Sequence, residues 1–264
     1  MAFPYLVWMI LFTIVPLLMV LYFSLVSDNG FSFLNYKRVM DPLYLNVIWR
    51  SIRLAFVSTV ICLVIGYPVA MIMAKSRSRL VLVLLFIIPM WMNFLARTYA
   101  WMTLLENNGL INLFFSWFGL GPFNMLHTEF AVILGMIYNF LPFMVLPICS
   151  VLQKMDPALV EASNDLGATP MSTFWHVTFP LSLPGVLSGV SMVFMPAVTT
   201  FVIPQLLGGG QFTMIGNLIE QQFLRTDDWG FGSSLSIILM ILILLSMGIM
   251  SHYDRDHEEG GGFF

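Results

Sequence analysis

Charged residues are scarce in this chain of 264 residues. Asp, Glu, Lys and Arg make up 9% of it, against about 25% in an ordinary soluble domain, and 59% of the residues are hydrophobic. The mean hydropathy of +0.88 agrees with this count. The composition predicts an integral membrane protein rather than a soluble one. A formal net charge of −3 leaves no basic face to neutralise phosphates, so no nucleic-acid partner is expected.

Cysteine is rare, and the motifs of common enzymes are missing. Cys62 and Cys149 each lie within an apolar run and are expected to be small buried hydrophobic residues. The 20 methionines and the four histidines are dispersed, so we expect no metal site. Neither HExxH nor GxSxG occurs, and the three glycines at 208–210 lack the Lys-Ser or Lys-Thr of a P-loop. We therefore expect no catalytic residue and no cofactor in this chain.

Long apolar runs, by contrast, are abundant. Crossing about 30 Å of hydrocarbon takes about 20 helical residues. Six runs are long enough: residues 3–26, 54–74, 80–103, 130–152, 184–207 and 233–252. They must be helical, because an unpaired backbone in lipid is too costly. The sequence predicts an all-α membrane protein with one transmembrane domain, residues 1–264, that ends in a disordered tail, residues 254–264.

The link between the second and third runs indicates the orientation. Lys75, Arg77 and Arg79 lie within five residues, and such a density of positive charge favours the cytoplasm. Six spans then place both termini and the loop at 153–183 in the cytoplasm. The first run lacks a basic start and a cleavage site, so it is expected to be a helix rather than a signal peptide. Two outer segments, 28–50 and 107–128, are half apolar and are expected to form short interfacial helices.

A polar segment interrupts the apolar runs on the cytoplasmic side. Residues 161–180 read EASNDLGATPMSTFWHVTFP. Asp156 and Pro157 are suited to begin a short helix before it, and Gly167 lies where a left-handed cap would end that helix. A second short helix is expected from about 170 to 179, after which Pro180 turns the chain back into the membrane. Such a unit suits a groove on another protein, and the alternative is an amphipathic loop on the lipid headgroups.

This segment resembles the EAA loop of bacterial ABC importer permeases. That motif reads Glu-Ala-Ala, three residues, Gly, nine residues, Ile, one residue, Leu-Pro. The matching positions here are Glu161, Ala162, Gly167 and Pro180. Ser163, Val177 and Phe179 are conservative departures from the motif. Further stretches, such as LPFMVLPICSVLQKMDPALVEASNDLGAT, are similar to the B-type permease subunit of spermidine/putrescine importers, over most of residues 35–240.

The resemblance implies a fold, a location and a set of partners. The fold is that of a type I ABC importer permease with six transmembrane helices, in a bacterial inner membrane. The partners are two ATPase subunits, which hold ATP and Mg²⁺, a second homologous permease and an extracytoplasmic polyamine-binding protein. The residues implied in coupling to the ATPase are Glu161, Ala162, Ser163, Asp165, Gly167 and Pro180. Movement of this loop would rock the spans between inward-open and outward-open states.

A path for polyamines, which are extended polycations, should offer aromatic faces and amide or carboxylate oxygens. The candidates in the spans are Trp91, Asn93, Tyr99, Trp101, Tyr138, Asn139 and Phe143. Pro89 and Pro142 lie near them and are suited to open the backbone. The candidates at the outer mouth are Glu220, Asp227 and Asp228. The alternatives are interface belts and helix–helix hydrogen bonds for the first set, and solvated loop charges for the second.

Arg97 lies within the third run and would repel a polycation if it lined the path. We expect it to snorkel to the interface or to pair with Glu106 or Glu129. Two other functions stay open. The same fold serves importers for thiamine, ferric iron or an anion. A membrane enzyme or structural subunit is the third class, and the lack of paired acids or a histidine cluster argues against an enzyme.

Overall fold

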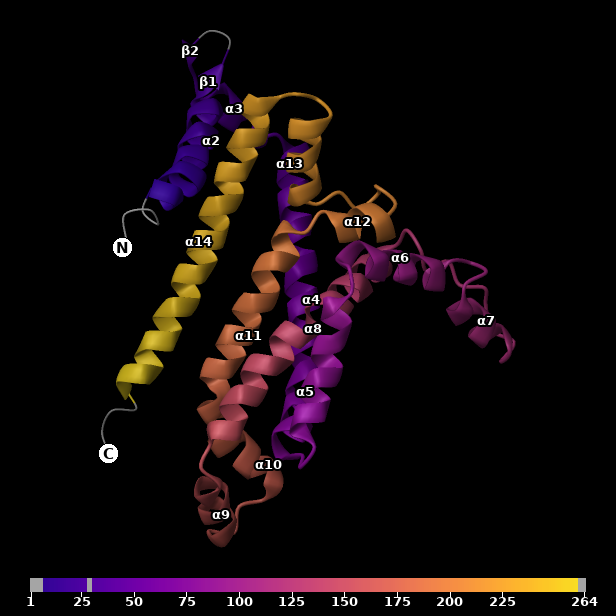
Figure 1. Cartoon of the computed structure of the whole chain (residues 1–264), viewed down its shortest axis with the longest axis vertical. Helices are drawn as coiled ribbons and strands as arrows, with labels where there is room; N and C mark the ends of the chain where they lie inside the picture. Colours follow the sequence, from indigo (N-terminus) through magenta and orange to yellow (C-terminus); the bar gives the residue numbers. More distant parts are fainter. Residues whose placement is uncertain (1–6, 28–29, 261–264) are drawn as a thin grey trace.

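The computed structural model describes residues 7–27 and 30–260, which form a long helical bundle (Figure 1). Five helices are long and apolar enough to span a membrane: Val7–Leu25, Pro42–Lys75, Glu129–Lys154, Pro170–Thr199 and Trp229–Gly248. A sixth span is the pair Leu80–Trp91 and Phe94–Ser116, whose two halves are bent by 92°. The predicted all-α fold with six spans is confirmed when the bent pair counts as one.

The first two spans are joined by a small unit of two short strands and one short helix. The first span comprises the π-helix η1 (Ile10–Ile14) and α2 (Val15–Leu25). The sequence predicted this span from residue 3, and residues 3–6 of that prediction lie outside the described residues. Strands β1 (Val26–Ser27) and β2 (Gly30–Phe31) pair antiparallel, and the short helix α3 (Leu34–Val39) follows. The second span, α4 (Pro42–Lys75), begins 12 residues earlier than predicted. Its start is fixed because Asp41 Oδ1 accepts from the Leu43 amide at 2.9 Å.

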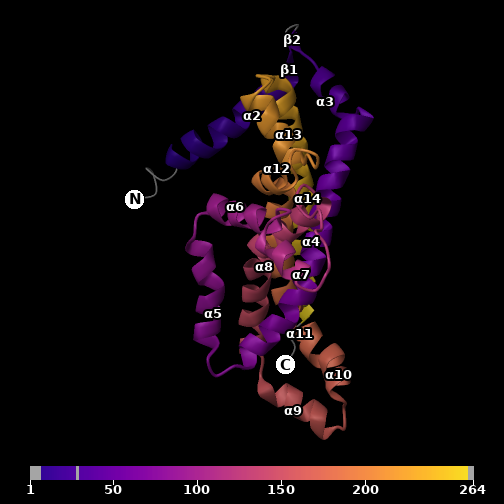
Figure 2. The same cartoon turned by 90° about the vertical axis from the view of Figure 1, so that its right-hand side faces the viewer.

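The third span is broken, which corrects the straight helix predicted for residues 80–103. Helix α5 (Arg79–Ile87) passes into the 3₁₀ turn η2 (Ile88–Trp91), and α6 (Phe94–Leu105) then turns across the bundle (Figure 2). Pro89 has no amide to continue the α5 hydrogen-bond ladder. Asn93 caps the new helix, since its Oδ1 accepts from the amides of Leu95 and Ala96 at 2.8 and 3.3 Å. The helix α7 (Leu110–Ser116) lies in the predicted outer segment.

The fourth span, α8 (Glu129–Lys154), runs unbroken through Pro142, so the expectation that this proline opens the backbone is wrong. The fifth differs from its prediction at both ends. Helices α10 (Pro170–Thr173), η3 (Phe174–Thr178) and α11 (Phe179–Thr199) form one continuous span, and Pro180 does not turn the chain. The span then breaks before α12 (Val202–Leu207), because the ring of Pro204 would clash with the carbonyl of Thr200 in a continuous helix.

Two further helices complete the bundle. Helix α13 (Ile215–Leu224) lies at the same end as α3, and α14 (Trp229–Gly260) descends beside α2 (Figure 1). A disordered tail was predicted from residue 254, whereas α14 continues through residues 254–260. No proline or glycine occurs between Ile249 and Glu259, and Glu258 and Glu259 favour a helix. Residues 261–264 lie outside the described residues.

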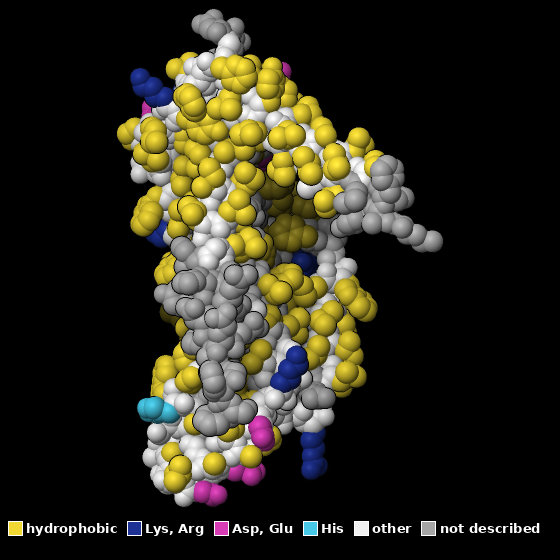
Figure 3. Space-filling model, turned by 90° about the vertical axis from the view of Figure 1, so that its left-hand side faces the viewer, with side chains coloured by type: hydrophobic (Ala, Val, Ile, Leu, Met, Phe, Trp, Pro, Cys, Tyr) yellow, Lys and Arg dark blue, Asp and Glu magenta, His cyan; other side chains and the backbone are white. Residues whose placement is uncertain are grey.

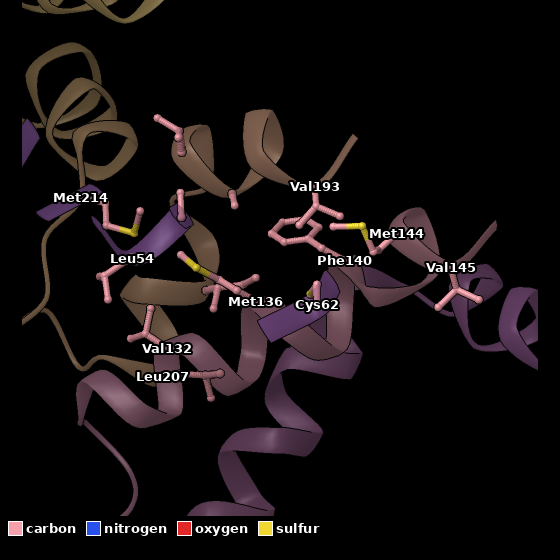
Figure 4. Close-up of a cluster of buried hydrophobic side chains, with 14 of the residues drawn as sticks. Leu54, Cys62, Val132, Met136, Phe140, Met144, Val145, Val193, Leu207 and Met214 are labelled. Atoms are coloured by element: carbon pink, nitrogen blue, oxygen red, sulfur yellow. The ribbon is translucent and has the colours of Figure 1, made fainter. Parts of the chain in front are cut away.

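The core lies where α4, α8 and α11 meet (Figure 4). Leu54, Met136 and Val193 are fully buried there, and Cys62 and Cys149 are buried, as expected. Two glycines of α11, Gly185 and Gly189, let that helix approach α8 closely. A Cβ added at Gly189 would lie 2.9 Å from Met144 Sδ, and one added at Gly185 would lie 3.1 Å from Ile148 Cα. This four-residue spacing of small residues is typical of packed membrane helices.

Candidate coupling loop and transport path

The predicted cytoplasmic loop forms a helix–turn–helix at one end of the bundle, opposite α13 (Figure 1). Helix α9 (Pro157–Asp165) begins as predicted, with Asp156 Oδ1 accepting from the Ala158 amide at 3.0 Å. It ends at Asp165, two residues before Gly167, whose φ of +79° is the left-handed conformation that the cap requires. The amide of Ala168 donates to Ser163 O at 3.1 Å and closes the cap.

The second arm of the loop is capped and tied to the first. The Thr169 Oγ1 accepts from the Ser172 amide at 3.3 Å and begins α10. The hydroxyls of Ser163 and Thr173 are hydrogen-bonded at 3.0 Å, which joins the two arms. Ser163 is therefore a positioning residue inside the loop, although it departs from the Ala of the EAA motif. A cavity of about 590 Å³ lies between the loop and the ends of α4 and α8.

The outer face of the loop is exposed and partly apolar. Glu161, Ala162, Asp165, Gly167 and Pro180 are all exposed. Leu166 is 89% exposed, Met171 67% and Trp175 55%. Acidic side chains gather at the same end of the molecule (Figure 3). Apolar residues so exposed on a capped, rigid loop favour a protein partner over plain solvent.

An aromatic cluster that the sequence reasoning missed joins the loop to the spans. Tyr67 of α4 is buried, and its ring lies 5.5 Å from that of Phe174 and 5.8 Å from that of Phe179. Its hydroxyl is 2.7 Å from Ser182 Oγ, which itself donates to Phe179 O at 2.9 Å. A tyrosine near the basic end of an otherwise apolar run was the available signal, because a buried hydroxyl needs a partner.

The structure brings only part of the predicted path together. The rings of Trp101 on α6 and Tyr138 on α8 lie 5.2 Å apart, edge to face. Asn139 is buried, its Nδ2 donates to Gly135 O at 2.8 Å, and its Oδ1 has no partner among the described residues. The others lie apart from this pair: Trp91 is 80% exposed at the end of η2, Asn93 is the cap of α6, Tyr99 is half exposed and Phe143 is 37% exposed.

The three acids predicted at the outer mouth have different environments. Asp228 pairs with Arg38 at 2.9 Å and accepts from the Phe231 amide at 3.0 Å. Asp227 accepts from the Trp229 indole at 2.6 Å. Glu220 makes no hydrogen bond or ion pair with any described residue. Two of the three acids therefore have structural partners, and Glu220 has none within the described part of the chain.

The expected pairing of Arg97 is wrong. Glu129 instead pairs with Arg53 at 2.6 Å, because α4 and α8 are neighbours, and Glu106 lies beyond 4.0 Å from the Arg97 guanidinium. Arg97 is half-buried, and its Nε has no hydrogen-bond partner in the described part of the chain. Snorkelling to the interface stays a prediction.

Residues 62–258 match the family described as binding-protein-dependent transport system inner membrane component. The chain is 40% identical over 254 residues to the "Spermidine/putrescine transport system permease protein PotB" of Salmonella typhimurium (strain SL1344), covering 92% of this chain and 87% of that one. It is 29% identical over 232 residues to the "Inner membrane ABC transporter permease protein YdcU" of Escherichia coli (strain K12), covering 82% and 74% of the two chains.

Solved structures show the same fold at lower identity. A chain of a bacterial ABC transporter involved in the import of the acidic polysaccharide alginate superposes with a TM-score of 0.82 at 17% identity, covering 96% of this chain and 93% of that chain. A chain of the MetNI methionine ABC transporter in an inward-facing conformation gives a TM-score of 0.55 at 18% identity, covering 80% and 94%. At these identities the likeness is one of fold alone.

Proposed function

The chain belongs to the family of binding-protein-dependent transport system inner membrane components, and we propose that it is the permease subunit of an ATP-driven importer for polyamines. Family and fold identify it as a multi-pass inner-membrane permease of the type I ABC importer architecture. The observation that carries the polyamine cargo is the 40% identity to a spermidine/putrescine permease over 92% of the chain. Thiamine, ferric iron or an anion would be alternative cargoes, but no feature of the described residues favours one of them.

In this proposal the loop that contains α9 and α10 docks in a groove of a cytoplasmic ATPase. Leu166, Met171 and Trp175 supply the exposed apolar contacts, and Glu161, Ala162 and Asp165 lie on the same loop. ATP, Mg²⁺ and the hydrolytic residues belong to the two ATPase subunits. The docked loop lies in the cytoplasm in this proposal, and α14 runs toward the same end of the bundle (Figure 1). An even number of spans would place both termini on that side.

Movement of the loop reaches the spans through two rigid connections. Helices α10, η3 and α11 are continuous, so a displacement of the loop turns the fifth span directly. The cluster of Tyr67, Phe174 and Phe179 ties the same segment to the second span. A closing ATPase pair would therefore move α4 and α11 together and shift the bundle between its two packed arrangements.

The other proposed partners are a second homologous permease and an extracytoplasmic polyamine-binding protein. Support for a second permease comes from the first span, of which only 6% is buried within this chain. Helix α2 leans away from the bundle and leaves one face of it open (Figure 2). A second permease packed against that open face would complete the path, since six spans alone enclose little room.

Uptake of labelled spermidine by cells that lack this gene tests the proposal. We expect the wild-type chain and Leu166→Met to restore uptake, and Leu166→Asp to abolish both uptake and co-purification of the ATPase. The Leu166 side chain is 89% exposed, so a charge there should spare the fold and disturb only the partner. Unchanged polyamine uptake after deletion, with no second carrier active, would refute the cargo. Full uptake by Leu166→Asp would refute the docking role.

A further inference from the structure

We propose that Glu220 binds one ammonium group of the transported polyamine, in a cleft between α11, α13 and α14. The inference rests on the proposed polyamine cargo and names the residue that recognises it. The cleft has a volume of about 450 Å³ and is lined mainly by apolar side chains. Its lining includes Thr199, Phe201, Glu220, Ser236, Leu239 and Met240. The face beside α14 is hollowed below its outer end and bears hydrophobic side chains (Figure 3).

Glu220 is the acid that the chain itself leaves available. Asp227 and Asp228 are engaged by Trp229 and Arg38, as described above. No cation among the described residues lies within 4.0 Å of the Glu220 carboxylate. Arg225, which follows α13, and Glu220 both line a second, smaller cavity of about 150 Å³. A carboxylate without a counter-ion in apolar surroundings favours a cation strongly.

The break in the fifth span adds further electronegative groups to the cleft. Helix α11 ends at Thr199, and the last carbonyls of a helix carry partial negative charge and lack intrahelical donors. Gly216 places α13 directly on them, because a Cβ at this position would collide with the carbonyl oxygen of Thr199. Glu220 follows Gly216 by four residues, so it lies on the same face of α13, one turn along. The carboxylate and the helix end therefore border one cleft.

The remaining lining suits an aliphatic ammonium ion. The hydroxyls of Thr199 and Ser236 already donate to Met195 O at 3.2 Å and Gly232 O at 2.9 Å. Each hydroxyl oxygen still has free lone pairs, so it can accept a hydrogen bond from an ammonium group. The ring of Phe201 offers a cation–π face, and the apolar side chains of α14 suit the methylene segments between two ammonium groups. The negative charge of Glu220 would repel a polyanion. This cleft therefore does not suit an acidic polysaccharide such as the one that the alginate transporter imports.

The complete transporter, reconstituted in proteoliposomes with its ATPase and binding protein, tests the inference. Labelled putrescine is the probe, and the quantity measured is the number of putrescine molecules transported per ATP hydrolysed. Loss of a hydrogen bond to a charged group lowers an equilibrium about tenfold or more, so Glu220→Gln should lower this ratio about tenfold. Glu220→Asp, which keeps the charge, should recover most of it. Glu106→Gln, an exposed acid on another loop, should keep the wild-type ratio.

The outcomes separate this inference from the proposed function. If the wild-type transporter moves no polyamine, the proposed function fails and the inference falls with it. If wild type transports putrescine and Glu220→Gln gives the same ratio, the function stands and the inference is wrong. A parallel fall of transport and ATP hydrolysis in Glu220→Gln, with the ratio unchanged, would show a structural role and would also overturn the inference.

Discussion

Gly167 allows a test that separates backbone conformation from partner contact. Its φ is +79°, and a Cβ added there would meet no atom of this chain within 4 Å. Substitution therefore creates no internal clash, and the cost within the chain is conformational. An L-residue in this region costs about 1–2 kcal/mol, and Asn tolerates it better than Ala. Gly167→Ala should thus lower the population of the capped loop by a factor of about 5–30, and Gly167→Asn by less.

Spermidine uptake and co-purification of the ATPase, measured side by side for both variants, provide the assay. If Gly167 is required for the turn, Gly167→Asn retains more of both activities than Gly167→Ala, although Asn is the larger residue. If the ATPase needs an empty space at this position, the order is reversed. The reversed order would refute the reasoning that the positive φ of Gly167 is what the loop requires.

Two further substitutions test how the loop and spans are held together. Gly185→Leu should prevent stable packing of α11 on α8 and lower the thermal midpoint in detergent, because the added Cβ alone would lie 3.0–3.1 Å from atoms of Val151, Ile148 and Pro147. Gly248→Leu is the control, since a Cβ at Gly248 meets no atom within 4 Å, and it should leave the thermal midpoint unchanged. Tyr67→Phe should lower stability by about 1 kcal/mol through its lost hydrogen bond, and Tyr67→Ala by about 3–5 kcal/mol through the lost ring, as measured by thermal unfolding. Equal losses for the two Tyr67 variants would contradict the role of the aromatic cluster.

Hydropathy predicted the spans because the bilayer requires a minimum length of apolar helix. The sequence also predicted the helix–turn–helix loop, since Asp156 and Gly167 each require a specific backbone position whatever packs around them. The break after Thr199 was not predicted, although Pro204 carries the signal. A proline inside a helical run breaks some helices and not others: α8 continues through Pro142, and α11 continues through Pro184 and Pro196.

Side-chain partners were predicted poorly, because they depend on which helices become neighbours. Pairing with Glu106 or Glu129 was one of the expectations for Arg97, yet α4 lies beside α8 and Arg53 binds the Glu129 carboxylate. The sequence pattern also could not show that Glu220 lacks a partner among the described residues while Asp227 and Asp228 have one. Their difference arises from contacts with Arg38 and Trp229, which only the folded chain brings together.

The most direct test of the central claim is ATP-dependent accumulation of labelled spermidine in proteoliposomes. The vesicles would hold the ATPase and the partner permease, with or without this chain, and the loaded binding protein would be added outside. The account predicts accumulation that requires both ATP and this chain, and that unlabelled putrescine inhibits. Accumulation in its absence, or a complete transporter that hydrolyses ATP but moves neither polyamine, would contradict the account.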